Sequence, residues 1–216
     1  MINLVQIFEE QDRLNKETAA KHEEYSKLTR DGLTRNFAFS ALCELGEMSN
    51  EWAGHKIWKS TRKENREAPC KKCNGRGEAC GDACPYCEGG IVNPLREEYI
   101  DIVHFVVSVA LGFDYDPKEY MNIYEVREVS PEDTYQLILD LYKNLVYANV
   151  LIEETRDLPH TEKLLKNNTK ERKKVAKALL DILVHLGYSL GFEDAEIEAA
   201  YFDKHKINQI RQENNY

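Results

Sequence analysis

The chain has 216 residues, of which 42% are hydrophobic and 31% are charged, a composition ordinary for a globular protein with a sizeable core. Its formal net charge of −9, with no long basic run, argues against direct nucleic-acid binding. No apolar run approaches the roughly 18–20 residues that span a bilayer, and we expect no membrane insertion. The acidic segment directly after the N-terminus predicts no signal peptide, and we therefore expect a cytoplasmic protein.

Outside residues 61–90, the apolar residues repeat at helical spacing. The stripe of the first expected helix comprises Leu4, Ile7, Gln11 and Leu14, and that of the second comprises Phe37, Ala41, Leu45, Met48 and Trp52. A third helix over residues 94–113 is the most apolar and begins at a proline. Three more are expected over residues 132–155, 170–190 and 193–211. The pattern predicts an all-α helical bundle that forms one catalytic domain over residues 1–216.

The irregular segment of residues 61–90 is an insert between the second and third helices, and it carries two C-x-x-C pairs. These pairs are Cys70 with Cys73 and Cys84 with Cys87. Their spacing suits a tetrahedral structural zinc site, which would hold together a loop that is too small to build its own core. Cys80 is a fifth candidate ligand. A zinc module that docks a protein partner and a redox C-x-x-C pair are the alternatives.

Two pairs of carboxylates lie three residues apart in segments that otherwise indicate buried helix: Glu44 with Glu47, and Glu98 with Asp101. Residues three apart share a helix face, and four carboxylates that face one space repel each other unless a divalent cation meets them. Glu97 lies four residues from Asp101, so spacing alone does not decide which glutamate takes part. A solvated helix face, or carboxylates paired with lysines, is the alternative for each pair.

Two or more magnesium ions held by Glu44, Glu47, Glu98 and Asp101 would favour phosphoryl chemistry by a metal-activated water. Magnesium prefers few protein carboxylates together with water and substrate phosphates. A di-iron site is the rival, but it requires Glu-x-x-His on two helices. Here His104 follows an aspartate at that spacing, and the first pair has no histidine after it.

Three motifs in this order resemble the dimeric dUTPase family, which belongs to the all-α nucleoside triphosphate pyrophosphatases. The first is ELGEMSNEW over residues 44–52, followed by Lys56-Ile-Trp58. The second is NPLREEYIDIVHF over residues 93–105, and the third spans residues 201–216. The resemblance covers most of the chain. It implies magnesium on both acidic pairs, hydrolysis of dUTP to dUMP and pyrophosphate, and a homodimer. It also implies that one glutamate of the first pair helps to activate water, and Glu47 is our candidate.

The last helix carries donors at i, i+4 and i+7, namely Lys204, Asn208 and Arg211, so these side chains share one face. Lysine and arginine suit phosphate oxygens, and an asparagine amide can pair with a base edge or a sugar hydroxyl. By the resemblance, Lys204 and Arg211 contact phosphates and Asn208 contacts the nucleoside. An exposed polar helix is the alternative.

Two further groups are candidate substrate contacts. Gln11 lies on an apolar stripe, with Asn15 four residues later, and a buried amide is usually hydrogen-bonded. The family resemblance implies that these amides contact the uracil edge, whereas a backbone partner is the alternative for Gln11. Lys56 could meet phosphate and Trp58 could pack on the sugar or base, but both could equally be ordinary surface and core residues.

The sequence leaves two other functions open. Spacing does not separate a dUTPase from a dCTP or broader deoxynucleotide pyrophosphatase, because one amide flip exchanges a donor for an acceptor. A zinc-bearing helical regulatory or adaptor protein is the non-enzymatic alternative, and the intact four carboxylates argue against it.

Overall fold

The computed structural model of the protein describes residues 2–79, 81–120, 131–157 and 162–213. Its helices are α1 (Leu4–Lys21), α2 (Glu23–Ser26), α3 (Arg30–Trp52), α4 (Pro94–Gly112), α5 (Pro131–Asp157), α6 (Glu162–Ser189) and α7 (Asp194–Glu213). A short 3-10 turn, η1, spans Pro117–Glu119. The prediction of an all-α helical bundle is confirmed. The candidate ligand Cys80 lies outside the described residues.

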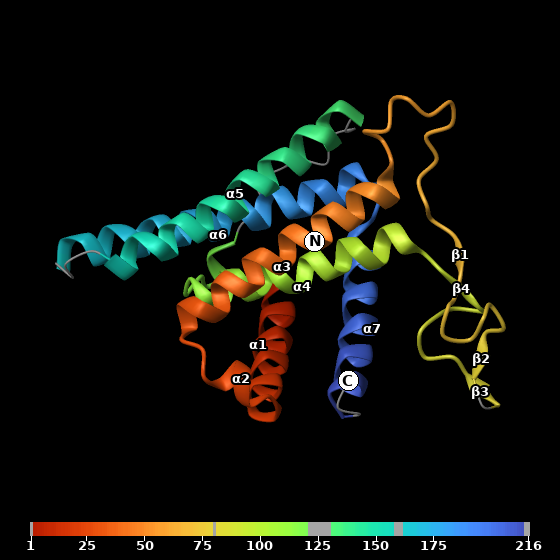
Figure 1. Ribbon diagram of the computed structural model, residues 1–216, viewed down its shortest axis with the longest axis horizontal. Helices are drawn as coiled ribbons and strands as arrows, with labels where there is room; N and C mark the ends of the chain where they lie inside the picture. The colour runs from red at the N-terminus through yellow and green to blue at the C-terminus, as the bar shows by residue number, and fades with distance from the viewer. Residues whose placement is uncertain (1, 80, 121–130, 158–161, 214–216) are drawn as a thin grey trace.

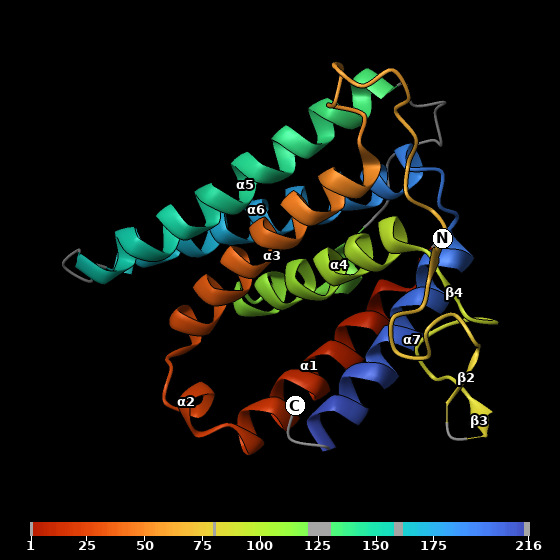
Figure 2. The same ribbon diagram turned by 45° about the vertical axis from the view of Figure 1, so that its right-hand side comes forward.

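The pair of α3 and α4 forms the centre of the bundle (Figure 1). The long hairpin of α5 and α6 packs against one side of this pair, and α1 and α7 lie side by side on the other (Figure 2). As a result α4 contacts α1, α3, α6 and α7. A helix that is covered on nearly every face has to be apolar all round, which explains the run of buried valines and isoleucines in α4.

Local signals explain where the two central helices begin. The Asn93 side chain accepts a hydrogen bond from the backbone N–H of Arg96, and Pro94 occupies the first turn of α4. The Thr29 side chain caps α3 in the same way through the N–H of Gly32. The helix expected over residues 94–113 begins at the predicted residue, Pro94, and ends one residue earlier than predicted, at Gly112. By contrast, α6 begins at Glu162 and not at residue 170. Asn167-Asn168-Thr169 is a run of weak helix formers that hides the first turns of this helix in the sequence.

In the described residues, the insert and the two residues after it form four strands of two residues each. No sequence pattern indicates them, because two residues are too few to show alternation. The strand β1 (Ala68–Pro69) pairs antiparallel with β4 (Ile91–Val92), and β2 (Glu78–Ala79) pairs antiparallel with β3 (Asp82–Ala83). The β1–β4 ladder brings the two ends of the insert together directly before Asn93, at the start of α4.

Among the described residues, no single helix is long and apolar enough to cross a membrane. Taken together across their 109° bend, Leu165–Ser189 and Asp194–Gln212 pass the same test, which the buried core helices of many proteins also pass.

The close approach of α6 to α4 predicts a stability difference between two glycine substitutions. At Gly187 an added Cβ would lie 2.4 Å from the buried hydroxyl of Tyr99, whereas at Gly46 on α3 it would meet nothing within 4 Å. We expect Gly187→Ala to lower the free energy of unfolding by about 1–3 kcal/mol through overpacking. The matched control Gly46→Ala should leave it unchanged or raise it by up to about 1 kcal/mol. Urea titrations would measure both, and equal effects would contradict the packing described here.

Candidate active site

Three of the four predicted metal-binding carboxylates converge between α3 and α4. Glu44, Glu47 and Glu98 each offer one carboxylate oxygen, and these oxygens all lie within 4.8 Å of one another. Glu44 and Glu98 are half-buried, whereas Glu47 is exposed. The packing of α3 along α4 therefore joins the two acidic pairs that the sequence separates by about fifty residues, and their oxygens are the ligand type that hard divalent cations prefer.

The electrostatics of this carboxylate cluster show that its negative charge is poorly balanced. Burial, followed by repulsion from Asp101, Glu44 and Glu47, raises the pKa of Glu98 to about 7. Burial and repulsion from Asp101 and Glu47 also raise the pKa of Glu44 above its usual range. Carboxylates that repel each other in this way hold protons near neutral pH unless a cation replaces those protons. The donor set therefore fits a divalent metal ion.

Asp101 lies beside the cluster but is paired within the protein. Its Oδ2 accepts a hydrogen bond from Lys204 Nζ at 2.6 Å, and both side chains are largely buried. Lys204 also lowers the pKa of Glu44 and Glu98, although by less than burial raises it. The last helix thus supplies one positive charge to the cluster. The roles of Asp101 as a metal ligand and of Lys204 as a phosphate contact stay predictions.

A cavity of about 370 Å³ adjoins the carboxylate cluster. Its lining joins residues from α1, α3, α4 and α7, among them Gln11, Asn15, Glu44, Asp101, His104, Ser108, Asn208, Arg211 and Gln212. The cavity therefore brings together Glu44 and five other residues that the sequence predicts to bind substrate or metal: Gln11, Asn15, Asp101, Asn208 and Arg211. Phe37 and Phe105 also line it, with their ring centroids 6.5 Å apart, and they offer an apolar wall for a planar base.

The two amides of α1 are hydrogen-bonded to each other and to side chains of α4 and α7. Gln11 Nε2 donates to Asn15 Oδ1 at 3.0 Å, and Asn15 Nδ2 donates to Ser108 Oγ at 3.1 Å. Gln11 Oε1 accepts from Tyr201 and lies 2.6 Å from His104 Nδ1. The partners of Gln11 are thus side chains and not backbone. His104 and Ser108 were not among the candidate site residues, although they are polar residues in the most apolar helix, one turn apart, and that signal could have found them.

Lys56 and Trp58 lie after the end of α3 and do not line the 370 Å³ cavity. Lys56 Nζ donates to the backbone oxygen of Asn50 at 3.0 Å. Trp58 is 73% exposed, and its ring makes a T-shaped contact with that of His55. Their proposed contacts with substrate stay predictions, and Trp58 is not a core residue. Trp52, by contrast, is buried in the main core.

Asn65, near the start of the insert, connects the end of α3 to the start of α4. Its backbone N–H donates to the carbonyl of Glu51 at 2.9 Å, and its side-chain amide donates to the Glu51 carboxylate at 2.5 Å. Its carbonyl accepts from the N–H of Leu95 at 3.1 Å, in the first turn of α4 where helix donors lack an internal partner. This contact fixes the ends of the two helices that carry the carboxylate cluster.

A family model described as dUTPase matches residues 3–71 and 91–216, and these ranges include every carboxylate of the cluster and every predicted substrate contact. The chain belongs to the all-α dUTPase family. No curated protein and no solved structure matched the chain. The match omits residues 72–90, so most of the cysteine-rich insert is additional to what this chain shares with the dUTPase family.

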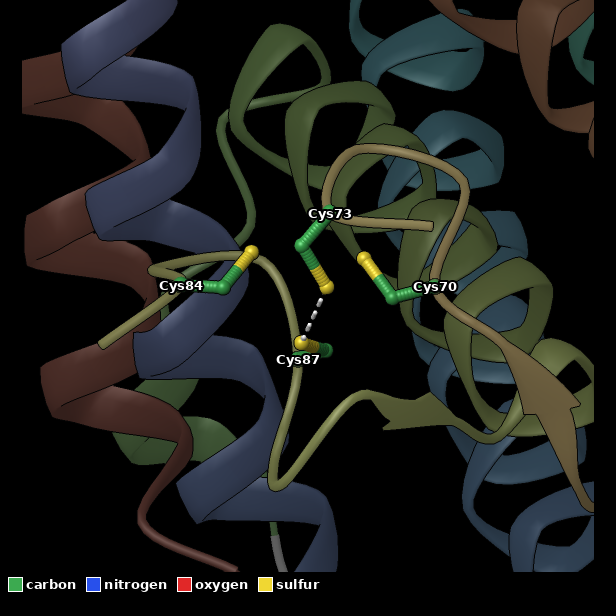
Figure 3. Close-up of side chains that lie close together, drawn as sticks. All are labelled: Cys70, Cys73, Cys84 and Cys87. Atoms are coloured by element: carbon green, nitrogen blue, oxygen red, sulfur yellow. Dashed lines mark hydrogen bonds between the residues drawn. The ribbon is translucent and has the colours of Figure 1, made fainter. Parts of the chain in front are cut away.

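The insert brings the cysteines of its two C-x-x-C pairs together (Figure 3). The Sγ atoms of Cys70, Cys73, Cys84 and Cys87 lie within 4.8 Å of one another, and those of Cys73 and Cys87 are 3.6 Å apart. Zn–S bonds of about 2.3 Å in a tetrahedron would place sulfur atoms about 3.8 Å apart. Cys73 Sγ also accepts a hydrogen bond from the N–H of Gly77 at 3.3 Å. The cluster can hold a zinc ion, as the spacing predicted.

The raised pKa values of the carboxylate cluster predict how the stability of the metal-free protein depends on pH. Between pH 4.5 and about 7, the folded protein keeps a proton on Glu98 that the unfolded chain has released. The free energy of unfolding should therefore fall as pH rises through this window. In protein without added divalent cations, this fall should be smaller for Glu98→Gln than for wild type.

Urea titrations across that window would measure the fall. The control is Glu153→Gln on α5, where the carboxylate is half exposed and paired with Arg35 at 2.8 Å, and it should behave as wild type does. Parallel curves for Glu98→Gln and wild type would contradict the charge repulsion inferred at the cluster.

Proposed function

We propose that this member of the dUTPase family hydrolyses dUTP to dUMP and pyrophosphate, with Mg²⁺ held by Glu44, Glu47, Glu98 and Asp101. The observation that carries the proposal is the position of the carboxylate cluster, beside a cavity lined by side-chain amides and the guanidinium of Arg211. An anionic site next to a cavity with hydrogen-bond donors suits a triphosphate that arrives with divalent cations and carries a base at its far end.

Each part of the cavity then has a role in the reaction. When bound, magnesium supplies positive charge that neutralises the triphosphate and polarises the phosphorus–oxygen bonds. Glu47 is the exposed member of the cluster and accepts the proton of the attacking water, as a general base must be able to reach its proton. The new bond forms between the water oxygen and phosphorus, and the bond to the leaving phosphate oxygen breaks.

The residues of α7 and α1 bind the two ends of the substrate. Arg211 and Lys204 lie on one face of α7 and contact phosphate oxygens, and in doing so the triphosphate competes with Asp101 for the Lys204 ammonium. Asn208 contacts the nucleoside, and Gln11 and Asn15 contact the edge of the uracil. Lys56 and Trp58 contact the substrate from outside the cavity.

We also propose that the protein works as a homodimer through an apolar stripe on α5. The stripe comprises Tyr135, Leu139, Tyr142, Val146 and Val150, at i, i+4, i+7, i+11 and i+15, and each is 37–52% exposed. The helix lies at the edge of the bundle (Figure 1), and the exposure of these side chains leaves the stripe open to a partner. A row of large exposed apolar side chains favours association with a second copy of the chain.

The cysteine cluster is proposed to hold a structural zinc ion. In the described residues, its buried set comprises three of the four cysteines, and only Tyr86, Cys87 and Val92 pack against them. So small an apolar core does not stabilise a loop of this length, whereas four metal–thiolate bonds do. A protein partner that docks on this module remains the second role proposed for it.

The experiment that tests the proposed reaction measures pyrophosphate release from deoxyribonucleotides and ribonucleotides with magnesium. Wild-type protein should hydrolyse dUTP fastest, and Glu47→Gln should lower the rate by more than about a hundredfold because the base is lost. The control Glu153→Gln makes the same chemical change on α5 and should keep the wild-type rate. If dCTP were hydrolysed fastest, the assigned base would change from uracil to cytosine. If no triphosphate released pyrophosphate, the proposed enzymatic activity would be refuted.

Zinc binding makes a separate prediction. Cys70→Ser should remove zinc from protein purified under reducing conditions and lower the melting temperature, since a loss of about 2 kcal/mol corresponds to roughly 4–8 °C in a chain of this size. Cys43 lies on α3, is exposed and is not part of the cluster. The control Cys43→Ser should therefore keep both zinc and stability. Elemental analysis and thermal melts would measure these changes, and an unchanged zinc content in Cys70→Ser would contradict the assigned site.

A further inference from the structure

A chain of hydrogen bonds runs from the backbone of α4 through both cavity amides and back to the ring of His104. Ser108 Oγ donates to the carbonyl oxygen of His104 at 2.9 Å. The chain continues through Asn15 and Gln11 and ends where Gln11 Oε1 lies 2.6 Å from His104 Nδ1. Each side-chain amide has one donor end and one acceptor end. If the amide of Gln11 turned over, that of Asn15 would have to turn over as well to keep the hydrogen bond between them.

The single hydroxyl hydrogen of Ser108 sets the direction of this chain. Ser108 Oγ is 2.9 Å from the carbonyl of His104 but 3.4 Å from Asn15 Oδ1, and the shorter contact takes the hydrogen. The Ser108 oxygen then accepts from the Asn15 amide nitrogen, and Asn15 Oδ1 accepts from Gln11 Nε2. It follows that the oxygen of Gln11, and not its nitrogen, faces His104.

The far end of the chain agrees with this direction. The Tyr201 hydroxyl lies 3.0 Å from Gln11 Oε1 and 3.2 Å from the carbonyl of Ile7, so its hydrogen has the shorter path to Gln11. The ring of Tyr201 stacks on that of His104 with centroids 4.3 Å apart, which fixes the plane of the imidazole. Both neighbours of Gln11 Oε1 are therefore held where they can donate.

The ring of His104 is neutral near pH 7. Only 4% of the residue is exposed, and burial, with smaller contributions from His205 and Lys204, lowers the pKa of His104 to about 3. A neutral imidazole carries one N–H, and a contact of 2.6 Å to an amide oxygen requires that hydrogen on Nδ1. Within the described residues Nε2 has no partner, as expected for the nitrogen without a hydrogen in a buried ring.

We infer that His104 is a positioning residue for base recognition: its Nδ1–H holds the Gln11 amide with the oxygen turned inward, which leaves the second N–H of Gln11 for an acceptor in the cavity. Uracil presents the O4 acceptor at the position where cytosine presents an amino donor. The inference rests on the proposed function and deepens it, since it names the group that makes the cavity select uracil over cytosine. In the dCTP complex, the Gln11 N–H would face the amino group of cytosine, and neither donor would have an acceptor. Leaving buried polar groups unpaired in this way discriminates strongly between substrates.

The tautomer can be measured without any substrate. In protein labelled with ¹⁵N-histidine, long-range ¹H–¹⁵N correlation spectra at neutral pH distinguish the two neutral forms, and the signals that disappear in His104→Asn assign the ring. We expect the Nδ1–H form for His104. The Nε2–H form, or a charged ring, would overturn the inference regardless of what the enzyme hydrolyses.

The consequence for selectivity is tested by the ratio of kcat/KM for dUTP to kcat/KM for dCTP. His104→Leu removes the closer of the two donors to Gln11 Oε1 and should lower this ratio by at least about tenfold, because the orientation of the amide is then held less strongly. His104→Asn restores an amide N–H near the position of Nδ1 and should keep the ratio within about threefold of wild type. Val107→Ala is the control, since it shortens a fully buried side chain of the same helix outside the chain of hydrogen bonds.

The outcomes separate the two claims. Folded His104→Leu protein with the wild-type ratio would overturn the inference and leave the pyrophosphatase in place, as would a wild-type enzyme that does not prefer dUTP. Failure of the wild-type protein to hydrolyse any pyrimidine triphosphate would refute the proposed function together with the selectivity that rests on it.

Discussion

The packing of α3 against α4 is the constraint on which the rest of the structure depends, because it holds three carboxylates within 4.8 Å of one another in a partly buried space. Like charges at this separation repel, and burial removes the water that would screen them. The raised pKa values of Glu44 and Glu98 record both effects. The apolar faces of α4 provide the opposing free energy, since α4 is covered by four other helices.

The same helix connects the two halves of the site. Asp101, His104 and Ser108 lie at i, i+3 and i+7 on α4, so they share one face and span roughly 10 Å along its axis. The acidic end of this face meets Lys204, and the other end meets the amides of α1. A nucleotide that places its phosphates at the first end and its base at the second would lie along α4. The arrangement explains why a helix in the core carries the few polar residues that it does.

The sequence predicted most of this arrangement because the signals were local. The helical repeat located the helices, and the spacing of carboxylates and cysteines identified both clusters. The parts that it missed depend on contacts between distant segments. The pairing of Asp101 with Lys204 joins residues about a hundred positions apart, and the partner of Gln11 on α4 is as far away in sequence. His104 and Ser108 stand out as polar residues in the most apolar helix, but the sequence does not show that His104 contacts the Gln11 amide. The start of α6 was missed because residues 167–169 are weak helix formers, and the contact of Asn168 with the carbonyl of Leu151 on α5 cannot be seen in the sequence.

The cysteine-rich insert does not disturb the site, because contacts outside the cysteine cluster hold the two ends of the insert together. The β1–β4 ladder brings residues 68 and 92 into register, and Asn65 binds both Glu51 at the end of α3 and Leu95 at the start of α4. Arg66 adds a hydrogen bond to the carbonyl of Leu190 and lies over the ring of Phe192. Since the entropy of closing a loop grows only slowly with its length, a segment whose ends are already held together can lengthen at little cost to the helices. The family match stops at residue 71, two residues after β1, and resumes at residue 91, the first residue of β4. The shared fold therefore ends where these contacts hold the chain.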